Sequence, residues 1–314
     1  MGFDLDSGYG PWRYQVFPSE EELREKLRLF ANVETDSTAR VTSVTFQPCL
    51  NEDHRSQDRR VVQSWNLRNG KWTFVGVFDG KLEKPAASRV AHNVSIFVGH
   101  AGHETVDYAM TELPHRIRSS LEVLLEEKAG STSMPYSPEI VSSLLGDTIT
   151  KFDKSLLEDL LSLFPGGLDG ALTLPDFHIQ EILNDADRGG QNLEKVRRCK
   201  RGSTALVSIV DPSGENLWVA NLGDCEAGER IYFRVSVHHD RSPFLPLAVL
   251  GTKTPNGTWR ATPLTVNHNG GNAAEVQRVQ DEHPGEKECI LRDRVLGAIA
   301  VTRGIFQQLL YRYS

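Results

Sequence analysis

Two acidic residues follow apolar runs of the sequence and could form a metal site. Asp79 ends the run that begins at Trp72, and Asp224 follows the run Leu217–Leu222 after one glycine. Short apolar runs bounded by turn residues are typical of buried strands, so both carboxylates are expected at the edge of a sheet. A carboxylate in such a place costs free energy unless it is paired or bound to a cation. The pattern predicts one carboxylate-lined site for a hard cation, Mg²⁺ or Mn²⁺.

Four segments follow one another along the chain in an informative order. They are Val77-Phe-Asp-Gly80, Gly202-Ser-Thr-Ala205, Val219-Ala-Asn-Leu-Gly-Asp224 and the run Trp259–Arg303. In this order they resemble the signatures of the metal-dependent protein serine/threonine phosphatases of type 2C, the PPM family. The order and spacing within the last run are similar to the pyruvate dehydrogenase phosphatase branch. The resemblance covers residues 41–303, which we expect to form an incomplete PPM-type phosphatase domain.

The resemblance implies a role for each acidic residue. Asp79 would bridge two metal ions, and the carbonyl oxygen of Gly80 would be a further ligand. Asp58 would hold a metal-bound water, and Asp224 would lie near an additional, weaker metal position. Two such ions about 3.5–4 Å apart lower the pKa of a bridging water and hold a phosphate for in-line attack.

Each acidic residue also has a plainer interpretation. Asp79 could be an ordinary turn residue, because Asp-Gly favours turns after strands. Asp58 could be a solvated loop charge, and Asp224 could be an acidic residue of a β-turn. The family places an acidic pair before its first hairpin. Glu52-Asp53 is a rival to Gln57-Asp58 for this pair, although it lies farther upstream.

His100 is the expected catalytic acid. The family motif runs Asp-Gly-His without a break, and the resemblance implies that this histidine protonates the leaving group. In this chain residues 81–99 separate Gly80 from His100. His100 and His103 could alternatively be read as a zinc pair, but no third ligand with suitable spacing follows them.

Two segments interrupt the family pattern. Without residues 81–99, Gly80 would continue directly into His100, and without residues 228–248, Ala227 would continue into the next family strand. We interpret both as translated introns, because a glycine codon, GGN, can contain the GT that opens an intron. Genuine loop insertions are the alternative. In either case we expect both segments to lie outside the sheets.

The chain leaves the family pattern again after Arg303. Residues 304–314 form a tail unlike the family, and the later Asp-Gly and Asp-Asn motifs, which supply two metal ligands in the family, are not found. The resemblance therefore implies a fold whose C-terminal part is missing. It also implies a weakened metal site, since a hard-cation site depends on its number of carboxylates.

The predicted fold class is α+β. Residues 60–79 read as a β-hairpin around Asn69-Gly70, and residues 104–128 and 139–163 read as helices, the second either continuous or broken at Gly146. Residues 165–201 are polar and mixed, and we expect a surface excursion there. Residues 1–40 form an extension with an amphipathic helix after Ser19. The resemblance adds two facing antiparallel β-sheets flanked by helices, a sandwich of the type 2C phosphatase kind.

The composition narrows the choice of partners. The chain has 314 residues and a net charge of −7 without a basic block, which argues against nucleic acid. No apolar run approaches the roughly 20 residues of a membrane span. We expect a monomer that acts on a phosphoprotein. The acidic N-terminus is unlike a transit peptide and favours the cytoplasm, whereas the family resemblance suggests the mitochondrion, so the compartment stays open.

The expected function is Mg²⁺- or Mn²⁺-dependent hydrolysis of phosphoserine or phosphothreonine by metal-activated water, impaired in this chain. A non-catalytic pseudophosphatase that binds phosphoproteins is one alternative. A translated product that does not fold is the other.

Overall fold

The structure is a computed structural model. It describes residues 18–29, 31–46, 58–80, 103–127, 136–224, 248–286, 288–297 and 299–305. The segment 81–99 and all but Ala248 of the segment 228–248 lie outside the described residues, so the prediction that they form loops stays a prediction. The chain divides into two compact units, residues 1–56 and 57–314.

The first unit contains one helix and one hairpin. Helix α1 (Glu20–Leu29) begins where predicted, because the Ser19 hydroxyl accepts a hydrogen bond of 3.2 Å from the Glu22 backbone N–H. Strands β1 (Ala31–Asp36) and β2 (Val41–Phe46) pair antiparallel. The Asp36 carboxylate caps the turn between them by accepting from the backbone N–H groups of the second and third residues after it.

The second unit is built on a four-stranded antiparallel sheet, in the order β3-β4-β5-β6. Its strands are β3 (Arg59–Leu67), β4 (Gly70–Gly80), β5 (Ser203–Val210) and β6 (Leu217–Leu222). The hairpin predicted for residues 60–79 is confirmed as β3 and β4. The Asn69 side chain holds its turn by accepting a 2.9 Å hydrogen bond from the indole of Trp72.

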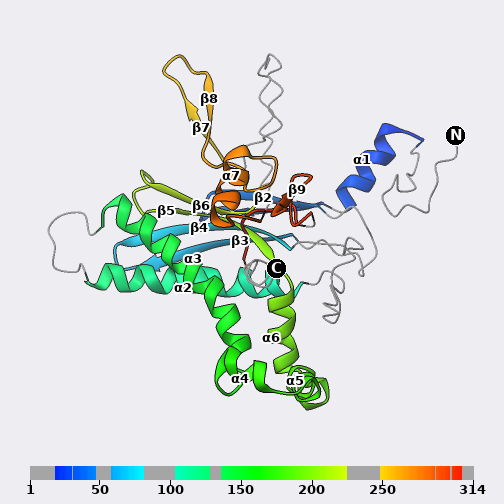
Figure 1. The fold of residues 1–314 in the computed structure, drawn as a ribbon. Helices are drawn as coiled ribbons and strands as arrows, with labels where there is room; N and C mark the ends of the chain where they lie inside the picture. The colour runs from blue at the N-terminus through cyan, green and yellow to red at the C-terminus, as the bar shows by residue number, and fades with distance from the viewer. Residues whose placement is uncertain are drawn as a thin grey trace. The chain divides into compact units, whose positions relative to one another are not determined.

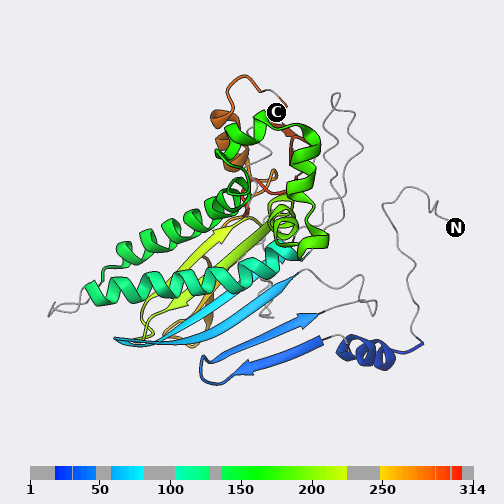
Figure 2. The ribbon, with the colours of Figure 1, turned by 90° about the horizontal axis from the view of Figure 1, so that it is seen from below.

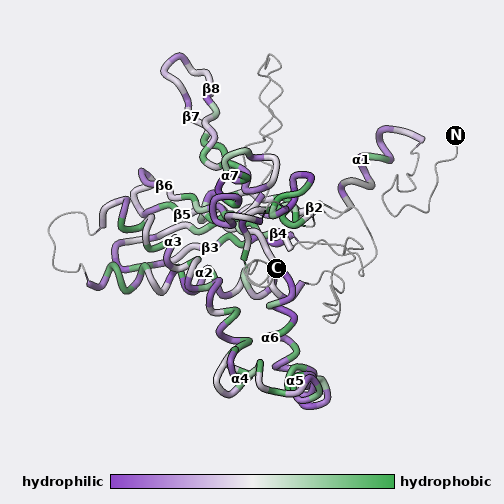
Figure 3. The backbone as a smooth tube through the Cα atoms, in the orientation of Figure 1, coloured by the Kyte–Doolittle hydropathy of each residue, from purple (hydrophilic) through white to green (hydrophobic). Residues whose placement is uncertain are grey.

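Two helices cover one face of this sheet (Figures 1 and 2): α2 (Glu104–Glu127) and α3 (Pro138–Leu161). Helix α6 (Gln191–Lys200) packs against both of them. The core between helices and sheet contains fully buried large side chains, namely Trp72, Phe74, Phe78, Leu113, Ile117, Leu121 and Phe152. Hydrophobic and hydrophilic stretches alternate along α2 and α3 (Figure 3), as expected for helices with one buried flank.

The structure refines two expectations about these helices. Helix α3 is not interrupted at Gly146; it runs on to Leu161 because Leu145 and Phe152 on its buried flank pack into the core. Residues 165–201 are not only a surface excursion. They contain α4 (Gly167–Thr173), α5 (Asp176–Leu183), the short helix η3 (Ala186–Arg188) and α6. Helix α6 buries Val196 and Cys199.

The remaining elements follow β6 in the sequence. They are the hairpin β7 (Val249–Lys253) and β8 (Trp259–Pro263), helix α7 (Ala273–Glu282), and the short hairpin β9 (Ile290–Leu291) and β10 (Arg294–Val295). The fold is therefore α+β with antiparallel sheets. Among the described residues the four-stranded sheet is the largest, and a second large sheet facing it stays a prediction. None of the helices described is long and apolar enough to cross a membrane.

Candidate active site at one end of the sheet

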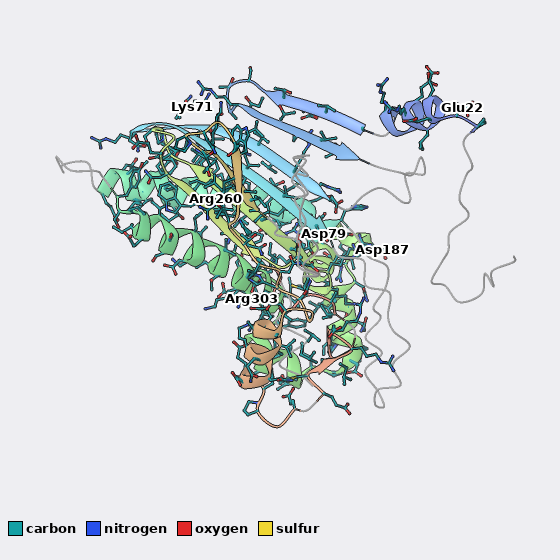
Figure 4. All side chains as sticks on the ribbon, turned by 90° about the horizontal axis from the view of Figure 1, so that it is seen from above. Glu22, Lys71, Asp79, Asp187, Arg260 and Arg303 are labelled. Atoms are coloured by element: carbon teal, nitrogen blue, oxygen red, sulfur yellow. The ribbon has the colours of Figure 1, made fainter. Side chains whose placement is uncertain are left out.

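The sheet register gathers the predicted acidic residues at one end. Asp79 pairs with Thr204 in the β4–β5 ladder. The β3–β4 ladder begins one residue after Asp58, and the β5–β6 ladder ends one residue before Gly223. When each ladder is continued by one residue, Asp58 lies opposite Asp79 and Gly223 lies opposite Thr204. Lys71 and Asp79 mark the two ends of β4 (Figure 4), and the predicted site lies at the Asp79 end.

The first residues of β5 hold the end of β4, which carries Asp79, in place. The buried hydroxyl of Ser203 donates hydrogen bonds to the carbonyl oxygens of Asp79, at 3.2 Å, and Thr204, at 2.8 Å. Ser203 pairs with Gly80 on one side and with the fully buried Ile305 on the other. The Gly202-Ser-Thr-Ala205 motif thus holds neighbouring strands together, and Ile305 lies beside the candidate site.

His268 fixes the position of Gly223. The backbone N–H of Gly223 donates to His268 Nδ1 at 3.2 Å, and the backbone N–H of His268 donates back to the Gly223 carbonyl at 3.1 Å. Burial, followed by the positive charge of Arg303, lowers the pKa of His268, while the charge of Asp224 acts in the opposite direction. A neutral imidazole therefore lies beside the loop that carries Asp224.

Sequence patterns did not single out His268 or the buried carboxylate of Glu275, which Arg303 contacts through two hydrogen bonds. Both residues lie inside the matched run Trp259–Arg303. In the sequence, His268 lies between two recognised segments of that run, and Glu275 lies on the apolar side of a predicted helix. These two positions are what could have drawn attention to them.

Arg59 joins the start of β3 to the start of α2. Its Nε donates to the Asp107 carboxylate at 2.6 Å, and its Nη2 lies 2.9 Å from His103 Nδ1. The Arg59 guanidinium has the charge to hold a phosphate, but it is engaged in these contacts and its side chain is 8% exposed. His103 therefore lies at the same end of the sheet as Asp58. His100, the predicted acid, lies outside the described residues.

The described residues include four of the positions that the resemblance implies for a metal site. Asp79 and Asp224 are half-buried, Asp58 is exposed, and Gly80 is buried. Within the described ranges, no three side chains of His, Cys, Asp or Glu come together as a group that could hold a metal ion. The donors present are of the oxygen type that Mg²⁺ and Mn²⁺ prefer, but they are too few for two ions. No catalytic step through a metal follows from these residues alone.

Replacement of Gly223 should show how tightly this end of the sheet is packed. Gly223 has φ +109°, and a Cβ there would overlap the side chain of Thr204. Gly214 in the β5–β6 turn also has positive φ, at +72°, but opens onto free space. We expect Gly214→Ala to cost about 1–2 kcal/mol for the left-handed backbone. Gly223→Ala should cost about 1–3 kcal/mol more because of the overlap. Urea denaturation of the two variants measures the difference, and equal losses would contradict the close packing.

Comparison with known proteins identifies relatives along most of the chain. No protein-family model matches it. A protein phosphatase 2C homolog of Schizosaccharomyces pombe is 22% identical over 292 residues, which cover 93% of this chain and 52% of the relative. The mitochondrial pyruvate dehydrogenase phosphatase 1 of Rattus norvegicus is 31% identical over 278 residues, 82% of this chain and 44% of the relative. A solved structure of a C. elegans sex determining protein is similar with a TM-score of 0.41 and 17% identity, over 83% of this chain and 42% of that one.

The curated relatives are longer than this chain, which spans about half their length. Their similarity nevertheless runs through the segments that carry Asp79 and Asp224, because it covers most of the 314 residues. The chain belongs to the PP2C-type phosphatase family, and pyruvate dehydrogenase phosphatases are among its homologues.

Proposed function

We propose that the chain is a metal-dependent protein serine/threonine phosphatase by descent, with a site that is incomplete in this polypeptide. The observation that supports the proposal is the sheet register, which pairs Asp79 with Thr204 and ends one residue from Asp58 on β3 and one residue from Gly223 after β6. Membership of the PP2C-type family supports phosphoserine or phosphothreonine in proteins as the substrate class.

The proposal gives a role to each residue at this end of the sheet. Asp79 and the carbonyl oxygen of Gly80 are first ligands for the metal, Asp58 orients water, and Asp224 adds negative charge beside them. Mg²⁺ or Mn²⁺ bound there would lower the pKa of a water and neutralise the phosphate. His100 is the proposed acid for the leaving oxygen. Ser203 keeps the end of β4 in place through its hydrogen bond to the Asp79 carbonyl.

The 314-residue polypeptide should hydrolyse p-nitrophenyl phosphate only at the background rate. The described residues bring too few carboxylates together to hold two ions, and a hard-cation site weakens with each ligand that is lost. Phosphate release in millimolar Mn²⁺ measures the rate, with Asp79→Asn as the matched variant. Mn²⁺-dependent turnover that disappears in Asp79→Asn would contradict the proposed impairment.

A second candidate function is a non-catalytic module that binds phosphoproteins. The observation in its favour is the lack of a complete group of metal ligands within the described ranges. A serine-phosphorylated peptide from the pyruvate dehydrogenase complex is a suitable first probe, since the rat and human relatives are named for that enzyme. Saturable binding of this peptide without turnover would favour the module. A thermal melt by circular dichroism identifies a chain that does not fold.

A further inference from the structure

The chain contains three asparagines that are followed directly by glycine, namely Asn69, Asn256 and Asn269. Such a pair can react with itself, because glycine has no Cβ and its backbone nitrogen can approach the side-chain carbonyl carbon of the asparagine. The attack closes a cyclic succinimide and releases ammonia. In a folded chain the reaction requires local opening of the backbone, so its rate depends on how firmly each pair is held.

Asn69 is held firmly in the turn between β3 and β4. Its Oδ1 accepts a 2.9 Å hydrogen bond from the indole of the fully buried Trp72, and its Nδ2 donates to the Tyr136 hydroxyl at 3.4 Å. Gly70 packs so closely on Pro212 that a Cβ there would overlap it. Both ends of the side-chain amide and the following glycine are therefore engaged, and succinimide formation would have to break these contacts.

Asn269 is held by the packing of the backbone around it. Its glycine, Gly270, is buried, and the Gly270 N–H donates to the Ala300 carbonyl at 3.3 Å. A Cβ on Gly270 would overlap the backbone of Asp293. Asn269 itself forms an antiparallel bridge with Val301, which is fully buried. This pair can react only if the surrounding segments separate.

Asn256 lies in a turn with much weaker support. Residues 254–258 connect β7 to β8, and every residue of these two strands is exposed. The Gly257 N–H donates to the Thr254 carbonyl at 2.9 Å, and a Cβ on Gly257 would meet only open space. A two-stranded hairpin is at best marginally stable on its own. The Gly257 nitrogen therefore becomes available at a lower free energy of opening than the glycine nitrogens of the other two pairs.

The side-chain oxygen of Asn256 is surrounded by hydrogen-bond donors. Its Oδ1 accepts from Thr258 Oγ1 at 2.8 Å and from the Thr258 N–H at 3.3 Å, and the Thr254 hydroxyl also contacts it. Negative charge develops on this oxygen when the glycine nitrogen adds to the carbon that carries it. Donors placed at an oxygen that becomes an oxyanion stabilise the transition state. The two threonines thus favour the reaction at this turn.

We propose that Asn256 is a site of spontaneous deamidation. The Gly257 nitrogen loses its proton to a base of the solvent and bonds to the side-chain carbonyl carbon. The side-chain nitrogen takes up a proton from water and leaves as ammonia. Water then hydrolyses the succinimide at either carbonyl carbon, which gives aspartate or isoaspartate, in which the main chain runs through the side chain. The proposal is independent of the proposed phosphatase function.

Either product changes the hairpin. A carboxylate replaces a neutral amide, and isoaspartate also lengthens the backbone between Thr254 and Thr258. The Thr254 N–H donates to the Thr258 carbonyl at 2.7 Å, which fixes the length of chain that fits between them. Isoaspartate should therefore loosen the turn.

Incubation of the complete chain at mildly alkaline pH, followed by peptide mass spectrometry, tests the site. We expect Asn256 to deamidate at least about tenfold faster than Asn69 or Asn269, with aspartate and isoaspartate as separable products. In guanidinium chloride, which unfolds the chain, the three rates should become similar, because all three are Asn-Gly pairs. Equal rates in the folded chain, or a faster reaction at Asn69 or Asn269, would overturn the proposal. So would an Asn256 that stays unmodified in the folded chain while the unfolded chain reacts.

Two threonine variants test the contribution of the donors. Thr258→Val removes the hydroxyl that contacts Asn256 Oδ1 but keeps the shape of the side chain, and it should slow the reaction about two- to tenfold, the usual range for one hydrogen bond. Thr252→Val on β7 is the matched control, since the Thr252 hydroxyl contacts the Arg260 carbonyl at 3.5 Å instead. It should leave the rate unchanged. If both variants slow the reaction equally, or if Thr258→Val accelerates it, the hydroxyl does not assist and the proposed mechanism at this turn is wrong.

Discussion

A repaired chain should show Mn²⁺-dependent phosphatase activity well above the background rate that we expect of the 314-residue polypeptide. The repair removes residues 81–99 and 228–248 and joins, after Arg303, a family C-terminal segment with its Asp-Gly and Asp-Asn motifs. The first deletion brings His100 directly after Gly80, where the leaving oxygen of a bound phosphate would lie. The added carboxylates complete the ligands for two ions, so a metal-bound hydroxide can form near neutral pH.

The position of Ile305 makes this repair structurally reasonable. Ile305 pairs with Ser203, which on its other side pairs with Gly80 at the end of β4. A segment joined after Arg303 therefore enters the unit beside the candidate site. Its second residue would take the backbone position of Ile305, whose N–H donates a hydrogen bond to the Ser203 carbonyl at 2.8 Å.

Variants of the repaired chain distinguish the proposed roles. His100→Ala should slow turnover by about 10²–10⁴, the usual contribution of a general acid, and Asp79→Ala should remove activity together with metal binding. Asp187→Ala, on the short helix η3, is a matched control and should have no effect. If the repaired chain folds and binds Mn²⁺ but hydrolyses no phosphopeptide, the assignment of Asp79 and His100 to catalysis is wrong.

Local patterns in the sequence predicted the parts of the site that lie on strands. An apolar run that ends in Asp-Gly identified the end of β4, and the Asn-Gly turn identified its hairpin partner β3. Once these strands are paired, continuing their register by one residue sets Asp58 opposite Asp79. This part was predictable because strand patterns and tight turns are encoded by neighbouring residues.

The contacts of His268 and Glu275 could not be predicted in the same way. His268 contacts Gly223, which is 45 residues away, and Glu275 binds Arg303, which is 28 residues away. No periodicity links residues at such separations, because their pairing depends on how the elements pack in three dimensions. The continuity of α3 through Gly146 also depends on tertiary packing, which outweighs the helix-breaking tendency of glycine.

Glu275→Gln should destabilise the second unit by about 3 kcal/mol, the usual cost of breaking a buried ion pair. The Glu275 carboxylate is 5% exposed and accepts hydrogen bonds from Arg303 Nε at 2.8 Å, Thr302 Oγ1 at 2.8 Å and Arg278 Nη2 at 3.2 Å. Glutamine has no charge, so the two guanidinium groups lose their shared partner. Urea denaturation at pH 7 measures the change in the free energy of unfolding.

The same carboxylate should make stability depend on pH. Burial alone would raise the pKa of Glu275, but hydrogen bonds from Arg303, Thr302 and Arg278 outweigh it and lower the pKa to about 2 from the usual 4.5. Because the pKa is lower in the folded chain, the stabilisation is fully present above pH 4.5 and is lost as the pH falls toward 2. The difference in unfolding free energy between the native chain and Glu275→Gln should therefore be constant near neutral pH and shrink below pH 4.5.

Glu282→Gln is the matched control, because it removes a carboxylate from the same helix and from the same arginine. Glu282 accepts a 2.7 Å hydrogen bond from Arg278 Nη1, but its side chain is 57% exposed. Its loss should cost less than about 1 kcal/mol, as for other surface ion pairs. If the two variants lose similar stability, burial of Glu275 does not strengthen its ion pairs. A large loss in Glu275→Gln alone would mean that Glu275 of α7 anchors Thr302 and Arg303, which lie directly before the bridge between Ile305 and Ser203 beside the candidate active site.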